Sequence, residues 1–465
     1  MRFKTTIISL VVLLVFGGAI YWYEFRGAPE RNKAKTQAER VFPGDFLTVS
    51  AIAIEKSDGR VRISRKSPEE WEIVEPLHTE ADNGLVKSLI NRLQNLEFRR
   101  VLDENPADLD KYGLSRPEIR VEFTGGVNAD TIELGNRGPI GSTLYLKKKS
   151  SPRIFLVDSS LKSLLNKGLF DLRERRIISF ERNQVEGIDL VYPDREIQLE
   201  LKDLKWKIAK PAAFLADESE VNRILTELIN LKADRFIVEK LEDPARYGFN
   251  RPQLLVTLNL KDKKTAAFRI GASAEGGVYA NRVGGDPVYL LDPQVVGKLA
   301  RNVNDFRDKT VIEIERDAFT ALEFARPGTT TVRIEKRTED RWRVSSPYSL
   351  DVDRFTLGNL FNEFRRITAQ EFVTDRPENL KPYGLDNPRL KISFFGANNK
   401  PINSLIIGKE SSAEKTFAKT DAPAVYQIES ERVNVILNKF QDILAGKTTP
   451  PPMFPVPRPG SASKP

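Results

Sequence analysis

A six-residue pattern that returns at a fixed interval is the strongest constraint on the fold of this chain. It reads Tyr-Gly-Leu-Ser-Arg-Pro at residues 112–117, Tyr-Gly-Phe-Asn-Arg-Pro at 247–252 and Tyr-Gly-Leu-Asp-Asn-Pro at 383–388. The two intervals between the three tyrosines differ by a single position. A fixed period is the mark of a repeated structural unit, so this chain of 465 residues is predicted to contain three copies of one unit.

Tryptophan, proline and glycine landmarks keep the same period. They are Trp71, Trp206 and Trp342, the prolines five residues after each (Pro76, Pro211, Pro347), and Gly135, Gly271 and Gly408. A tryptophan in an alternating apolar and polar run is more often a core anchor than a binding platform. We therefore expect the three tryptophans in the cores and the three glycines at the ends of strands.

The tyrosine-glycine pattern itself predicts a short helical turn rather than a ligand-binding loop. A proline precedes each tyrosine, at Pro106, Pro244 and Pro377, and proline suits the first position of a helix. The glycine after each tyrosine suits the left-handed residue that ends a helix, and the next apolar residue would pack back on the turn. The final proline of the pattern favours an extended predecessor, so a strand is expected to follow.

The order of elements predicts α+β repeats with mainly antiparallel sheets. Alternating strands are followed by an amphipathic helix, whose stripes are Val86, Leu89, Leu93 and Leu96; Val221, Ile224, Leu228 and Leu231; and Leu357, Leu360, Phe364 and Ile367. Further strands and a second helix, around residues 161–169, 295–306 and 433–444, close each unit. Hairpin-length gaps favour antiparallel pairing. We define repeat 1 as residues 45–176, repeat 2 as 177–311 and repeat 3 as 312–446.

The N-terminal residues 1–23 are predicted to be a cytoplasmic tip and a transmembrane helix. Residues 5–23 form an uncharged run that is long enough to span a bilayer as a helix. A cleaved signal peptide is the rival interpretation, but the bulky end Ile20-Tyr21-Trp22-Tyr23 lacks the small residues of a cleavage site. Lysine and arginine occur on both flanks and leave the orientation open, and we prefer periplasmic repeats because a large C-terminal part follows a signal-like start. Residues 24–44 are predicted to be a linker, and the proline-rich residues 447–465 a disordered tail.

Composition excludes several classes of chemistry. The chain has no cysteine and one histidine, His78, which is expected on the surface. It has no phosphate-binding loop, nucleophile elbow or dinucleotide fingerprint, so no catalytic, cofactor-binding or metal-binding residue is singled out, and no cofactor is expected. The 73 basic and 65 acidic residues interleave, so the net charge of +8 does not predict nucleic-acid binding. The best basic cluster, Arg173-Glu174-Arg175-Arg176, is interpreted as a solvated junction.

An N-terminal anchor, Trp-x-Ile/Val, a helix and Tyr-Gly-Leu-x-x-Pro together resemble the bacterial envelope family called domain of unknown function 4340. The resemblance covers residues 45–446, and Phe249 departs from the leucine of the pattern. It implies an association with ABC-type transport systems and offers no catalytic residues. Our first hypothesis is a non-enzymatic, single-pass inner-membrane protein whose periplasmic repeats serve as a scaffold or accessory subunit for ABC permease and ATPase subunits. The alternatives are a carboxylate-dependent enzyme acting on envelope polysaccharide, and a binder of anionic polymer.

Overall fold

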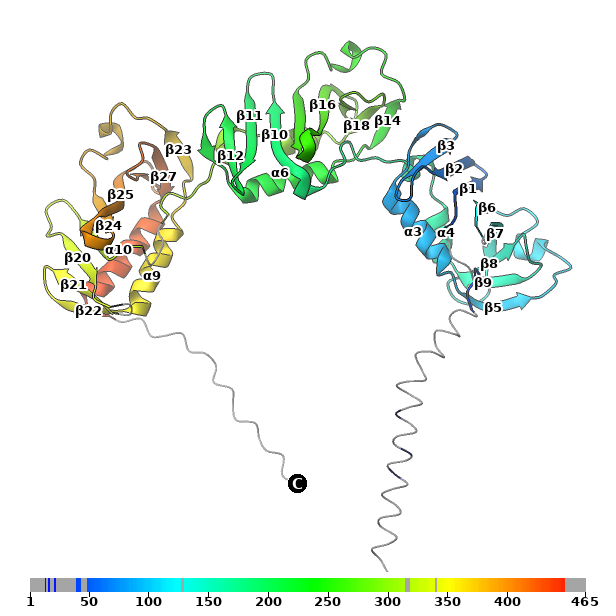
Figure 1. The fold of residues 1–465 in the computed structure, drawn as a ribbon, viewed down its shortest axis with the longest axis horizontal. Helices are drawn as coiled ribbons and strands as arrows, with labels where there is room; N and C mark the ends of the chain where they lie inside the picture. The colour runs from blue at the N-terminus through cyan, green and yellow to red at the C-terminus, as the bar shows by residue number, and fades with distance from the viewer. Residues whose placement is uncertain are drawn as a thin grey trace, which may run out of the picture. The chain divides into compact units, whose positions relative to one another are not determined.

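A computed structural model describes residues 13, 16, 21, 39–42, 48–126, 129–313, 318–338 and 341–447. The chain divides into two compact units: Met1–Ile177 with Lys232–Glu239 and Tyr289–Leu291, and Ile178–Leu231 with Lys240–Val288 and Asp292–Pro465. Within them lie three sheets of nine strands each, here called sheets 1, 2 and 3 (Figure 1). The predicted class of three tandem antiparallel α+β repeats is confirmed.

The three sheets have the same strand order. In each, the first four strands lie on one side of the sixth strand, with the first strand next to it and the fourth at the edge. Sheet 1 has the order β4-β3-β2-β1-β6-β7-β8-β9-β5, and sheets 2 and 3 repeat it. Its strands are β1 (Ala51–Lys56), β2 (Gly59–Arg65), β3 (Trp71–Glu75), β4 (Thr79–Glu80), β5 (Phe98–Asp103), β6 (Ile119–Thr124), β7 (Asp130–Arg137), β8 (Thr143–Lys148) and β9 (Ile154–Asp158).

Sheet 2 consists of β10 (Val185–Val191), β11 (Glu196–Lys202), β12 (Lys205–Lys210), β13 (Phe214–Leu215), β14 (Arg235–Val238), β15 (Leu254–Leu260), β16 (Thr265–Ala274), β17 (Gly277–Arg282) and β18 (Val288–Leu291). Sheet 3 consists of β19 (Ala321–Ala325), β20 (Val332–Lys336), β21 (Arg341–Ser346), β22 (Leu350–Asp353), β23 (Glu371–Thr374), β24 (Leu390–Phe395), β25 (Pro401–Glu410), β26 (Lys415–Lys419) and β27 (Val425–Glu429).

Helices cover one face of each sheet, and the core lies between them. The first helix of each repeat is α3 (Asn83–Gln94), α6 (Glu218–Asn230) or α9 (Arg354–Arg365). The predicted apolar stripes of these helices face the core, together with the three tryptophans, which are at most 9% exposed. In repeat 1 this core joins Trp71, Val86, Leu89 and Leu93 to the inward residues of β1, β2, β6, β7 and β8. The alternation in the strands therefore has the expected cause, one buried face and one open face.

An aspartate that the sequence analysis did not single out begins each first helix. Asp82, Asp217 and Asp353 stand at the N-cap, where their carboxylates accept backbone N–H groups of the first turn. Burial alone would raise the pKa of Asp217, but the hydroxyl and backbone N–H of Ser219 and the N–H of Glu220 outweigh it and lower the pKa.

The prolines five residues after the tryptophans, Pro76, Pro211 and Pro347, all follow cis peptide bonds.

The closing helices differ from the prediction in repeats 1 and 2. Each is broken in two, into α4 (Ser160–Leu165) and α5 (Leu169–Leu172), and into α7 (Gln294–Leu299) and α8 (Val303–Phe306). The break falls where Gly168 and Asn302 are extended and donate their N–H groups to Asp171 and Asp305. These local bonds start a new helix and turn the chain.

In repeat 3 the closing helix α10 (Ser430–Leu444) is continuous, as predicted. It lies beside α9 (Figure 1), and Glu363 of α9 is buried next to it. The Glu363 carboxylate lies 3.3 Å from Arg366, 3.8 Å from Arg432 and 4.0 Å from Lys439. Two of these three cations come from α10, so the cluster links the two helices.

The chain enters each repeat through a segment that docks beside the last strand of its sheet. Phe98 N–H donates to Glu39 O at 2.8 Å, Ala233 N–H to Arg175 O at 2.7 Å and Ala369 N–H to Lys309 O at 2.8 Å. The predicted linker, residues 24–44, therefore includes part of the fold, because Val41 and Phe42 are 2% exposed in the core of repeat 1. Val311 and Ile312 take the same place in repeat 3.

A buried arginine follows each broken closing helix and contacts a strand of the next sheet. The Arg173 guanidinium lies 3.4 Å from the ring centroid of Phe236 and bonds Glu239 at 2.7 and 2.6 Å. Arg307 lies over Phe372 at 3.8 Å and pairs with Asp375 at 2.7 Å. Arg173 was expected in a solvated junction, but its side chain is 4% exposed because the aromatic ring and the carboxylate enclose it.

The tyrosine-glycine pattern forms the predicted turn, although it begins later than the prolines suggested. The turns are the 3-10 helices η2 (Asp110–Tyr112), η4 (Ala245–Tyr247) and η6 (Lys381–Tyr383), each ended by a left-handed glycine. Pro106 and Pro377 lie before these turns rather than at their first position. The turns instead begin after Asp108, Asp243 and Asn379, whose side chains accept an N–H group two residues on. Other 3-10 turns are η3 (Arg182–Gln184), η5 (Lys261–Lys263) and η7 (Ala397–Asn399).

The predicted transmembrane segment lies outside the described residues apart from three isolated positions, as does all but the first residue of the predicted tail. In the part of the chain that the structure describes, no helix is both long and apolar enough to cross a membrane. His78 is exposed, as expected.

Candidate functional site

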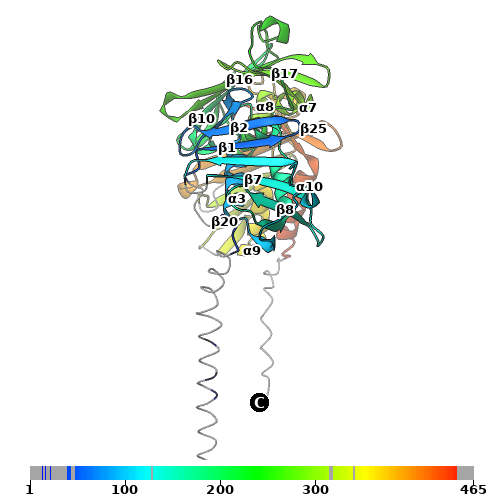
Figure 2. The ribbon, with the colours of Figure 1, turned by 90° about the vertical axis from the view of Figure 1, so that its right-hand side faces the viewer.

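The open faces of the sheets are where function has to be sought, because helices cover the other faces. The tyrosine turn occupies part of each open face. In repeat 1, Tyr112 and Leu114 pack on Ile154 and Tyr145, with the two tyrosine rings edge to face at 5.1 Å. The turn approaches β7 so closely that a Cβ atom at Gly135 would lie 2.2 Å from Tyr112 O. Strands β1, β2, β7 and β8 lie in one layer (Figure 2). The part of their open face that the turn leaves uncovered carries polar side chains.

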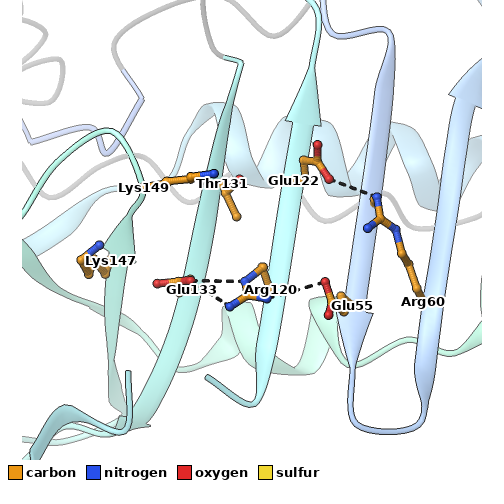
Figure 3. Close-up of a pocket in the computed structure, with 9 residues that line it drawn as sticks. Glu55, Arg60, Arg120, Glu122, Thr131, Glu133, Lys147 and Lys149 are labelled. Atoms are coloured by element: carbon orange, nitrogen blue, oxygen red, sulfur yellow. Dashed lines mark hydrogen bonds and ion pairs between the residues drawn. The ribbon is translucent and has the colours of Figure 1, made fainter. Parts of the chain in front are cut away.

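In repeat 1 this remainder is a hollow of about 340 Å³ across β1, β2, β6, β7 and β8 (Figure 3). Apart from Lys149, which follows the end of β8, its lining residues alternate with core residues along their strands, which is why they share the open face. They are Ala53, Glu55, Arg60, Arg120, Glu122, Thr131, Glu133, Lys147 and Lys149.

Ion pairs organise the carboxylates of this hollow. Arg120 lies between Glu133 at 3.2 Å and Glu55 at 3.8 Å. Arg60 contacts Glu122 at 3.1 Å and also Glu75, outside the hollow, at 3.4 Å. Each of the three glutamates in the hollow therefore has a guanidinium partner, contributed by a different strand.

The two lysines of the hollow have no carboxylate partner among the described residues. Lys147 Nζ contacts only a backbone carbonyl, that of Lys148 at 3.4 Å, and the Lys149 ammonium has no hydrogen bond or ion pair with the described residues. Both stand at the β8 side of the hollow, next to Thr131 and Glu133 (Figure 3). A carboxylate or phosphate group of a ligand or partner would find two free ammonium groups here.

The hollow does not recur in the other repeats. The strand registers place Val191 and Ala325 at the position of Glu55, Thr257 and Ser393 at that of Glu122, and Arg269 and Ile406 at that of Glu133. Arg120 itself is replaced by Leu255 and Lys391. The framework of the repeat is thus kept while the chemistry of the open face changes.

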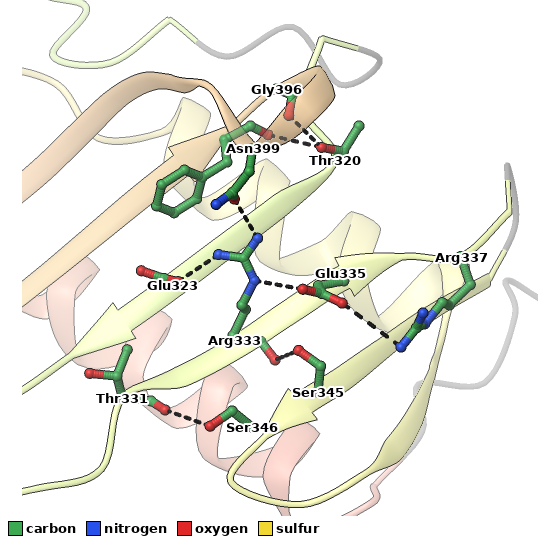
Figure 4. A network of polar contacts seen from close by, with 11 residues as sticks. Thr320, Glu323, Thr331, Arg333, Glu335, Arg337, Ser345, Ser346, Gly396 and Asn399 are labelled. Carbon is green, nitrogen blue, oxygen red and sulfur yellow. Dashed lines mark hydrogen bonds and ion pairs between the residues drawn. The ribbon is translucent and has the colours of Figure 1, made fainter.

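Sheet 3 carries a different network, centred on Arg333 of β20 (Figure 4). Its guanidinium contacts Glu323 at 2.5 Å, Glu335 at 2.6 Å and Asn399 at 2.6 Å. Burial alone would lower the pKa of Arg333, but the hydrogen bonds to Glu335 and Glu323 outweigh it and raise the pKa. The network is saturated with internal partners and fixes the surface of this sheet.

In sheet 2, two asparagine amides take part in the contacts of the central strands. Asn259 donates to Asp189 at 3.0 Å, and the Arg269 guanidinium donates to Asn281 at 3.0 and 3.2 Å. Burial lowers the pKa of Arg269, which meets an amide oxygen rather than a carboxylate. Three equivalent faces thus present three different polar surfaces.

The sequence analysis named no site residue, and it missed the convergence of Glu55, Glu122 and Glu133. These glutamates come from three strands, and their side chains meet only through the register of β1, β6 and β7. The available signal was their alternation with core residues in repeat 1 and their replacement in repeats 2 and 3. Among the described residues, no group of three or more histidine or acidic side chains is placed to hold a metal ion.

The fold and its repeated framework define a class of protein, that of three tandem antiparallel α+β repeats. The chain belongs to the family described as Domain of unknown function (DUF4340), which it matches over residues 71–205, 206–341 and 342–451. The matches begin at the three tryptophans, so each starts in the third strand of a sheet and the first two extend into the next sheet. A search of curated proteins found no match.

Proposed function

We propose that this protein is a non-enzymatic, membrane-anchored scaffold or accessory binding subunit of an ABC-type transport system, with its repeats on the periplasmic side of a bacterial inner membrane. One observation carries the proposal: three copies of one framework present three different polar faces. A scaffold needs several distinct contact surfaces held by one chain. The tryptophan, tyrosine and glycine landmarks of the framework recur in each repeat, whereas the polar residues of the open faces differ.

The charge pattern favours protein partners over nucleic acid. Around the hollow of repeat 1, acidic and basic groups alternate across the sheet, and in sheet 3 Arg333 is enclosed by Glu323 and Glu335. A nucleic-acid surface needs a continuous basic patch, because phosphate contacts supply most of its affinity. Permease and ATPase subunits are the partners we expect.

The experiment is a mild-detergent pull-down of the full-length protein from its native membrane, with mass spectrometry of the recovered proteins. ABC permease and ATPase subunits should be recovered, and recovery should fall when residues 1–23 are replaced by an unrelated anchor. The double variant Lys147→Glu and Lys149→Glu tests the face of repeat 1, with Lys66→Glu in the exposed β2–β3 loop as the matched control. Recovery of no transport subunits would refute the proposal.

A second candidate function rests on the three glutamates of the hollow, which occur in one repeat only. A carboxylate-dependent enzyme acting on envelope polysaccharide would use two such groups as acid and base or nucleophile. Glu55, Glu122 and Glu133 each contact a guanidinium of the hollow, so none of the three carboxylates is left open to a glycosidic oxygen. The hollow therefore suits binding better than acid catalysis. Release of sugar fragments from envelope polysaccharide, abolished by Glu133→Gln and not by Glu118→Gln outside the hollow, would reverse this ranking.

A further inference from the structure

The outer edge of β22 differs from the same edge in the other two sheets. In repeats 1 and 2 the chain that leaves the broken closing helix crosses this edge and pairs with it. Asp82 N–H donates to Leu172 O at 2.8 Å, and Glu174 N–H donates to Glu80 O at 2.9 Å. In repeat 2, Asp217 N–H donates to Phe306 O at 2.8 Å and Asp308 N–H to Leu215 O at 2.9 Å.

In repeat 3 none of the described residues takes the position of this segment. Because α10 continues to Leu444, the described chain does not turn across the edge as it does in repeats 1 and 2. Val352, ten residues after Trp342, corresponds to Ala81 and Ala216, so the Asp351 carbonyl and Asp353 N–H correspond to the paired groups of repeats 1 and 2. Within the described ranges, no backbone group of another strand pairs with these two. β22 also has four residues, whereas β4 and β13 have two.

Two exposed aromatic side chains flank this open edge. Tyr348 is 47% exposed and Phe355 is 49% exposed. Counted from the tryptophans, their counterparts are Leu77 and Ala212, and Gly84 and Ser219. The aromatic pair thus occurs only in the repeat whose edge is open, which is an observation independent of the backbone.

We propose that the β22 edge is a docking site for an extended, apolar segment of a partner protein, which adds to sheet 3 as an antiparallel strand. The segment would take the place that 172–174 and 306–308 take in the other repeats. One residue accepts from Asp353 N–H, and the residue two positions later donates its N–H to Asp351 O. Apolar side chains of the segment contact Tyr348 and Phe355, as in other cases of strand addition. This inference rests on the proposed scaffold role and gives it a defined surface.

The chain's own residues 448–465 fit this slot less well. Prolines stand at positions 450, 451, 452, 455, 457, 459 and 465, and a proline has no N–H to donate to the Asp351 carbonyl. Gly446 lies beside Leu350 of β22, and the three consecutive prolines 450–452 that follow shortly after it supply no donor near this edge.

The test uses a fluorescently labelled synthetic peptide of residues 303–310, which contains the Phe306-Arg307-Asp308 segment that fills the slot in repeat 2. Its binding to the full-length protein, purified in mild detergent, is followed by fluorescence anisotropy. The matched control is the same peptide methylated on the backbone nitrogen of Asp308, which removes only the donating N–H. We expect this control to bind about tenfold more weakly, as the loss of one backbone hydrogen bond predicts. Phe355→Ser, which installs the residue of repeat 2, should also weaken binding.

Equal affinity for both peptides, or no binding of either, overturns the proposal. Binding that appears only when the chain is ended at residue 447 also overturns it, because the chain's own C-terminal segment would then occupy the edge. In either case a positive pull-down of transport subunits would still support the scaffold role through other surfaces. The two proposals therefore fail separately.

Discussion

Replacing Gly135 by alanine should destabilise repeat 1 more than any exposed change of the same size. A Cβ atom there would lie 2.2 Å from Tyr112 O, and the same approach is 2.0 Å at Gly271 and 2.1 Å at Gly408. Real Cβ contacts stay above 3.0 Å, so the tyrosine turn would have to leave the sheet by at least 0.8 Å. That movement strains the hydrogen bond from Tyr112 to Asp103, now 2.9 Å long.

The expected cost is about 2–4 kcal/mol, the sum of an overpacking term and one weakened hydrogen bond. Gly297 provides a control for the same substitution, because it lies inside α7 and a Cβ atom there would meet nothing within 4 Å. Gly297→Ala should instead stabilise its surroundings by about 0.5–1 kcal/mol, through a less flexible unfolded chain.

Hydrogen exchange with mass spectrometry is the suitable assay, because three repeats need not unfold in one step. Peptides covering β6 and β7 should exchange faster in Gly135→Ala, and peptides of repeat 3 should not change. Unchanged protection of β6 and β7, or an equal loss of protection in Gly297→Ala, would refute the reasoning that backbone approach is what requires glycine.

Three further outcomes are expected. Glu239→Gln should lower the free energy of unfolding, measured by heat or urea, by about 1–3 kcal/mol, because it leaves the Arg173 guanidinium buried without its carboxylate. This cost is below that of a fully buried pair, since Glu239 is 50% exposed. The control Glu104→Gln, whose ion pair with Arg153 is exposed, should cost less than about 1 kcal/mol. The lowered pKa of Asp217 means that its carboxylate stabilises the fold above its ordinary pKa of 3.8, and that this share is lost as the pH falls through the lower folded value. Asp217→Asn, which keeps an N-cap side chain without a titrating group, should therefore flatten the acid limb of a stability-against-pH curve, and an unchanged limb would show that other groups control it. Glu363→Gln should cost about 1–3 kcal/mol and loosen α10 selectively, seen as faster exchange in residues 430–444. Arg366 and Lys439 lose their carboxylate partner, and Arg432 keeps only Glu429.

The sequence was sufficient for the architecture because its framework residues are large, rare or conformationally special. The cores bury three large apolar side chains, those of Trp71, Trp206 and Trp342. Positive φ angles of 69°, 74° and 65° occur at Gly113, Gly248 and Gly384. Such residues report on local structure or on burial, and the fixed period makes each of these signals visible three times.

The features that were missed depend on contacts between distant segments or on competing local bonds. The break in the first closing helix follows from the N–H of Gly168 meeting Asp171, which competes with continuing the helix. The burial of Arg173 depends on Phe236 and Glu239, which belong to repeat 2 and lie far away along the chain. The hollow depends on strand register, which pairs Glu55 of β1 with Arg120 of the neighbouring strand β6. Hydropathy patterns carry no information on any of these.

The lead-in segments have a consequence for cutting this protein into pieces. A recombinant repeat 3 that began at β19 would lack Val311 and Ile312, which are 5% and 2% exposed in its core, and would lose the backbone bond from Ala369 to Lys309. The core would then be open to water on one side, and such a fragment would be prone to aggregate. A fragment that begins at residue 309 or earlier keeps Val311 and Ile312 in the core. A fragment that begins at Trp342, where the family match begins, would also lack the strands β19 and β20.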